Sequence, residues 1–175
     1  EIYFNSNIQR LIQNYRSSFL QLGLHKLYSG ESDGKLNTRS LLGQMDTYFP
    51  PEVIPVSEPD LDIQIGRIYS QAGDSAALKK RLKNLQTRPS LDMETHFYIG
   101  QVYINELNDY ESAIALYNNL KETYPLVGDI RYALIQAYSQ IGRAEEAIKE
   151  LEDWLIVNPT DDRAKEMLKF LRSQA

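Results

Sequence analysis

The residues best suited to acid–base or metal chemistry in this sequence are its two histidines. His25 lies near the apolar face of a predicted N-terminal helix, and His96 follows Glu94 at the predicted start of another helix. They do not stand at the i, i+4 spacing that lets one helix present two histidines to a metal ion. We therefore interpret each as a structural or surface residue rather than as a ligand or general base.

Three pairs of neighbouring carboxylates could also do acid–base work. The pairs are Asp60 with Asp62, Glu145 with Glu146, and Asp161 with Asp162. Each pair stands where a helix is expected to begin, and negative charge there interacts favourably with the helix dipole. The sequence contains no Gly-rich phosphate loop, calcium-loop pattern or Gly-x-Ser-x-Gly elbow. We predict no catalytic residue, no cofactor, no metal site and no enzymatic activity.

Composition narrows the function classes further. The 175 residues include no Cys, which excludes a thiolate zinc site, an iron–sulfur cluster and a Cys nucleophile. Residues 91–175 carry eight Lys or Arg against fifteen Asp or Glu, which argues against nucleic acid as the main partner. The longest apolar run, Ala113–Tyr117, is five residues, far short of the ~20 that a membrane helix needs. We expect no membrane insertion of this segment.

One basic cluster, Lys79-Lys80-Arg81, interrupts this pattern. On a helix it would alternate with Leu78 and Leu82, which would take the inner face. We interpret the cluster as a solvated helix face, the alternative being a docking site for an anionic partner or lipid headgroup.

The helices that would position a functional site are expected to repeat along the chain. Several residue types return at a spacing of 34 or 35: Gly66 and Gly100; Tyr69, Tyr103 and Tyr138; Ala113 and Ala147; Pro125 and Pro159. The glycines let a neighbouring helix come close, and the prolines stop the second helix of each unit. Gly73 and Gly142 stand where the first helix must end.

These residues resemble the tetratricopeptide repeat. The stretch 142–151, ending in Val157-Asn158-Pro159, matches the consensus almost position by position, and 108–114, ending in Tyr124-Pro125, is similar. The unit at 59–89 departs from it, with Leu78 where a small Ala is usual. The resemblance implies an all-α fold, a right-handed α-solenoid of helical hairpins with a C-terminal capping helix.

We predict one continuous domain in three parts. Residues 1–58 form a degenerate helical hairpin and a Pro-rich connector, 59–160 form three tetratricopeptide-like repeats, and 161–175 form the capping helix.

Two further motifs carry a second resemblance. Residues 15–19 (YRSSF) and 49–55 (FPPEVIP) are similar to the soluble tail of uncharacterised bacterial proteins whose front portion is a multi-pass membrane domain. This resemblance implies covalent attachment to an upstream membrane domain and a position at a bacterial membrane surface, on the periplasmic or cytoplasmic side. The absence of a starting Met fits a piece of a longer protein. The residues themselves do not indicate the compartment.

The first helix of each unit would line a concave groove. Counting along these helices predicts nine partner-binding residues: Ile63, Arg67, Gln71, Phe97, Gln101, Asn105, Tyr132, Gln136 and Gln140. Amides both donate and accept hydrogen bonds, which suits the backbone of an extended peptide. Arg67 is the only cation in this set, so we expect no tight binding of chaperone tails that end in a carboxylate.

We therefore predict a protein-interaction module that binds a peptide or partner protein in this groove and belongs to a larger protein. The alternatives are a non-catalytic accessory domain of a membrane-embedded transferase-like protein and a structural homo-oligomerisation domain, whose groove residues would be polar merely because that face is wet.

Overall fold

The computed structural model describes residues 6–89 and 91–174, which form nine α-helices and no strand. The predicted all-α class is therefore confirmed. The chain divides into two compact units, Glu1–Arg88 and Pro89–Ala175. Among the described residues, no helix is long and apolar enough to cross a membrane. The predicted three-part division of a single domain stays a prediction.

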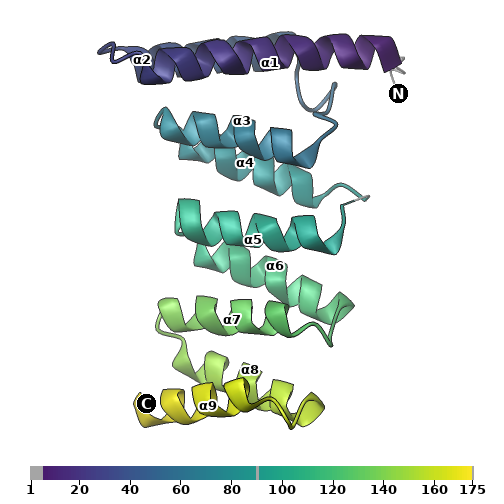
Figure 1. Ribbon diagram of the computed structural model, residues 1–175, viewed down its shortest axis with the longest axis vertical. Helices are drawn as coiled ribbons and strands as arrows, with labels where there is room; N and C mark the ends of the chain where they lie inside the picture. The colour runs from purple at the N-terminus through teal and green to yellow at the C-terminus, as the bar shows by residue number, and fades with distance from the viewer. Residues whose placement is uncertain (1–5, 90, 175) are drawn as a thin grey trace. The chain divides into compact units, whose positions relative to one another are not determined.

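Unit 1 consists of two helical hairpins (Figure 1). The first pairs α1 (Ser6–Tyr28) with α2 (Gly34–Tyr48), and the second pairs α3 (Pro59–Gln71) with α4 (Ser75–Gln86). Helix α3 begins with Pro in its first turn, where a missing N–H costs nothing. An irregular connector joins α2 to α3.

Arg16 ties the Pro-rich connector to the core of unit 1. Its side chain is 2% exposed. The guanidinium donates to the carbonyl oxygens of Phe49 (3.2 Å), Pro55 (3.3 Å) and Ile54. The connector has few backbone hydrogen bonds of its own, so the buried Arg16 side chain supplies donors to three of its carbonyl groups.

A buried charge network joins the two hairpins of unit 1. Arg81 donates to Asp62 at 2.5 Å and to Asp46 at 2.6 Å, and Arg88 donates to Asp62 at 2.7 Å. Arg81 and Asp62 are both buried. The expectation that Arg81 belongs to a solvated basic face is therefore wrong, because two carboxylates hold it inside. Its neighbour Lys80 is exposed, as expected.

Unit 2 contains two complete hairpins and a final helix (Figure 1). These are α5 (Met93–Leu107) with α6 (Tyr110–Thr123), α7 (Gly128–Gln140) with α8 (Ala144–Val157), and α9 (Asp162–Gln174). Helices α6 and α8 end two residues before Pro125 and Pro159, as predicted. Gly73 in unit 1 and Gly142 follow the first helices of their hairpins with φ of +92° and +75°, conformations that favour glycine.

Small residues bring the helices of unit 2 close together. A Cβ atom on Gly100 would stand 2.7 Å from Oη of Tyr117 and closer still to two of its ring carbons. The ring of Tyr117 therefore lies directly against the backbone of α5, and its hydroxyl donates to the carbonyl of Phe97 at 3.3 Å. Ala113 and Ala147, which were expected at tight crossings, are fully buried.

Polar contacts fix α9 against α7 and α8. Oδ2 of Asp161 accepts hydrogen bonds from Tyr132 Oη at 2.7 Å and from Trp154 Nε1 at 2.8 Å. Its other oxygen accepts from the backbone N–H of Ala164 at 3.1 Å and caps the helix. One carboxylate thus joins three helices, which sets the place of α9 in unit 2.

Candidate partner-binding groove

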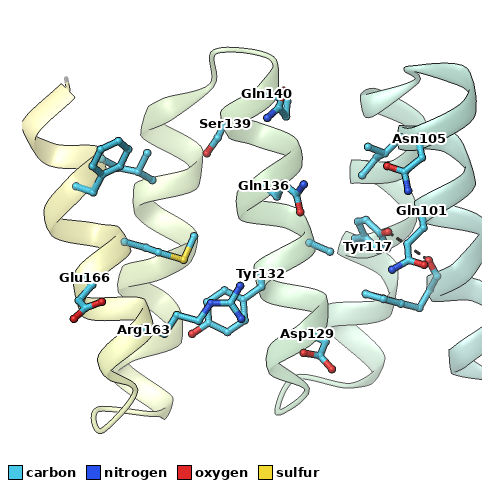
Figure 2. Close-up of a pocket in the computed structure, with 16 residues that line it drawn as sticks. Gln101, Asn105, Tyr117, Asp129, Tyr132, Gln136, Ser139, Gln140, Arg163 and Glu166 are labelled. Atoms are coloured by element: carbon cyan, nitrogen blue, oxygen red, sulfur yellow. Dashed lines mark hydrogen bonds between the residues drawn. The ribbon is translucent and has the colours of Figure 1, made fainter.

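One open groove of about 910 Å³ runs along unit 2. Its walls come from α5, α7 and α9, with Tyr117 of α6 between them (Figure 2). The sixteen lining residues are Phe97, Gln101, Ile104, Asn105, Tyr117, Asp129, Tyr132, Ala133, Gln136, Ser139, Gln140, Arg163, Glu166, Met167, Phe170 and Leu171. This size falls within the range of ligand-binding clefts.

Six of the nine residues predicted from the sequence lie together in this groove. They are Phe97, Gln101, Asn105, Tyr132, Gln136 and Gln140. The four amides form two pairs, each pair one helical turn apart, on α5 and α7 (Figure 2). All four are exposed, and within the described residues none makes a hydrogen bond. Their donors and acceptors are therefore available to a ligand.

Helix α9 provides a wall of the groove that is not among the predicted binding residues. Met167, Phe170 and Leu171 form an apolar strip along it, and Phe170 is 62% exposed. The repeat period could have found this wall, because Met167 stands 35 residues after Tyr132 and Leu171 stands 35 after Gln136. Helix α9 therefore corresponds to the first helix of a further repeat, and it lines the groove as the first helices α5 and α7 do.

Charged residues gather at the other end of the groove. Asp129, Arg163 and Glu166 surround Tyr132 (Figure 2). The guanidinium carbon of Arg163 is 4.0 Å from the centroid of the Tyr132 ring, a cation–π contact. Within the described residues, Asp129 and Glu166 have no ion-pair or hydrogen-bond partner. This end therefore presents two unpaired carboxylates beside one stacked cation.

The hydrogen bond from Tyr132 to Asp161 holds the charged end in place. Burial and the neighbouring Asp161 carboxylate raise the pKa of Tyr132 to about 12. The hydrogen bonds that Asp161 accepts from Trp154 and Tyr132 lower the pKa of its carboxyl group. At neutral pH, Tyr132 is therefore a neutral donor and Asp161 a charged acceptor.

The other three predicted residues, in unit 1, are not among those that line this groove. Ile63 is completely buried, so the expectation that it offers a surface to a partner is wrong. Arg67 is half-buried, and Gln71 is exposed and accepts a hydrogen bond from the Tyr28 hydroxyl at 3.0 Å. Ile63 follows the spacing of Phe97, and spacing alone does not report how deeply a position is covered.

The histidines occupy separate places. His25 is exposed, and Nδ1 of His96 lies 2.9 Å from the backbone oxygen of Asp92, the residue that caps α5. In the described part of the chain, no group of three or more His, Asp or Glu residues is arranged to hold a metal ion.

Comparison with known proteins identifies the repeats. The family model described as tetratricopeptide repeat matches residues 105–169. A solved structure of MamA AMB-1 is 19% identical, covering 93% of this chain and 83% of its own, with a TM-score of 0.51. A structure of a MamA point mutant is 20% identical over 94% of this chain and 83% of its own, also with a TM-score of 0.51. At these identities the likeness shows the fold alone, and it confirms the predicted helical-repeat fold. No curated protein matches the sequence.

Proposed function

We propose that this chain, which belongs to the tetratricopeptide repeat family through residues 105–169, is a non-catalytic protein-interaction module. Its partner would bind as an extended peptide in the groove of unit 2. The observation that carries the proposal is the convergence of four unpaired amides and an apolar strip on a single open groove.

The chemistry of the groove suits an extended backbone. Such a backbone offers both N–H and C=O groups along its length, and each amide side chain can donate and accept. Gln101 and Asn105 stand on α5, and Gln136 and Gln140 stand on α7, the middle of the three helices (Figure 2). A ligand that satisfied these groups would gain orientation, while its side chains would contact the apolar strip on α9.

The test begins with a peptide chosen by selection from a random library against the full chain. The Kd of the labelled peptide is then measured by fluorescence anisotropy for the wild type and for the double variant Gln101→Ala, Asn105→Ala. A hydrogen bond contributes about 0.5–1.5 kcal/mol, so losing two weakens binding by about five- to a hundredfold. The matched control is Gln44→Ala with Asn119→Ala, two exposed amides outside the groove.

The control pair is expected to bind as tightly as the wild type. A selected peptide that binds both double variants with wild-type affinity would contradict the proposal, because it would show that the binding surface lies elsewhere. The alternatives of an accessory domain and of self-association stay predictions.

A further inference from the structure

The charges of unit 2 are unevenly balanced, and the groove shares this imbalance. Residues 89–175 carry eight Lys or Arg and fifteen Asp or Glu. Of the three charged residues in the groove, Asp129 and Glu166 are acidic and have no partner in the described part of the chain. Both the local site and the field of the whole unit therefore attract cations and repel anions.

The single cation of the groove is already in contact with an aromatic ring. Arg163 stacks on Tyr132 at 4.0 Å from the ring centroid, and Tyr132 is itself held by Asp161 through a 2.7 Å hydrogen bond. An acidic ligand could meet the in-plane N–H donors of Arg163 while the stack stays intact, but its own charge would then approach the carboxylates of Asp129 and Glu166. A basic ligand would meet the two carboxylates with Arg163 left where it is.

The apolar strip lies a short distance along the same helix. Glu166 and Phe170 are four residues apart on α9, a rise of about 6 Å at 1.5 Å per residue. An extended peptide advances about 3.3 Å per residue, so two of its residues span this distance. Side chains two apart on an extended strand also point to the same side.

We propose that the groove of unit 2 selects an extended peptide in which a Lys or Arg stands two residues from a large apolar side chain. The basic side chain binds at the charged end of the groove, where Asp129 and Glu166 lie on either side of the Arg163–Tyr132 stack, and the apolar side chain packs on Met167, Phe170 and Leu171. This inference rests on the proposed function and adds to it the chemical class of the partner.

The first arm of the experiment is the sequence pattern of the peptides selected on the full chain. The expected result is enrichment of Lys or Arg two positions from Leu, Met, Phe or Trp. Replacing the basic residue of the best binder by norleucine should weaken binding about three- to tenfold, the scale of one or two partly exposed charge pairs. Selected peptides that are neutral or acidic would overturn the inference.

The second arm compares two charge-neutralising variants of equal size. Asp129→Asn with Glu166→Gln should weaken the basic peptide about three- to tenfold and abolish the effect of norleucine. Glu122→Gln with Asp153→Asn removes the same charge from exposed positions outside the groove and should change the affinity less than twofold. Equal losses in both variants would place the attraction in the overall field and overturn the assigned site.

The two variants distinguish failure of the basic peptide class from failure of the groove as a binding site. If the groove amide variant weakens binding but the Asp129, Glu166 variant does not change it, the groove binds peptides and the basic class is wrong. If no peptide is selected, or if the amide variant binds normally, the proposed function is wrong and the inference is overturned with it.

Discussion

Gly100→Ala is the substitution that tests the packing behind the groove most sharply. Gly100 is in the middle of α5, and a Cβ atom there would come within 2.7 Å of Oη of Tyr117 and closer to two of its ring carbons. The ring is completely buried, so it has no open space to move into. Tyr117 borders the groove from beneath its surface, so a displaced ring would shift the residues that a ligand meets.

Two opposing effects decide the size of the change. Replacing Gly by Ala inside a helix stabilises by roughly 0.5–1 kcal/mol, because Ala loses less conformational freedom on folding. Forcing an extra methyl group into a packed interior costs about 1–3 kcal/mol and can cost more. The contact here is with a completely buried aromatic ring that also packs on Phe97, so the upper part of that range applies. We expect a net loss of about 1–2 kcal/mol in the free energy of unfolding.

The assay is urea denaturation followed by the fluorescence of Trp154, the only Trp in the chain. It lies in α8 of unit 2 and therefore reports the unit in which Gly100 lies. The matched control is Gly43→Ala in α2, where a Cβ atom has no neighbour within 4 Å. The control should stabilise unit 1 by about 0.5–1 kcal/mol, measured by circular dichroism. A Gly100→Ala variant as stable as the wild type would refute the close approach of α5 and Tyr117.

Two further predictions concern polar contacts. Asp161→Asn should lower the free energy of unfolding at pH 7 by about 1–2 kcal/mol, because charged hydrogen bonds to Trp154 and Tyr132 are weakened. The pKa of the Asp161 carboxyl is lowered in the folded state, so its contribution is complete well above pH 4. This contribution is lost as the pH falls through that lowered value. Urea titrations should therefore show a smaller difference in the free energy of unfolding between the variant and the wild type at pH 3 than at pH 7. An equal difference at both pH values would contradict this. Arg16→Met should destabilise unit 1 by about 3 kcal/mol, because three connector carbonyls lose their donor. Arg16→Lys should recover only part of this, and full recovery in circular dichroism melts would show that charge alone suffices.

The sequence predicts the helices well because their signals are local and repeated. Tyr69, Tyr103 and Tyr138 are buried at one position of successive first helices, as the period of 34 or 35 indicates. Gly73 and Gly142 end helices with positive φ, a conformation that few other residues adopt.

The site is harder to predict because it depends on how elements cover one another. Periodicity places Ile63 and Phe97 at equivalent positions, yet Ile63 is buried and Phe97 lines the groove. Helix α9 reads as a cap when only its own apolar face is considered. Its Phe170 nevertheless remains 62% exposed on the groove. That exposure depends on how α9 packs against α8.

The burial of Arg81 shows the same difficulty for charge. Next to two lysines it reads as part of a basic surface, and nothing local distinguishes it from them. The carboxylates that bury it, Asp46 and Asp62, come from two other helices. Pairings over such distances along the chain are not encoded in the helical period.

The central claim is that unit 2 binds an extended peptide in its groove, and mapping of NMR chemical shifts tests it most directly. The ¹⁵N-labelled full chain would be titrated with the selected peptide, and backbone and side-chain amide shifts would be followed. We predict the largest changes at the Gln101, Asn105, Gln136 and Gln140 side chains and along the groove face of α9. Changes confined to unit 1, or to α6 and α8 outside the groove, would contradict the account.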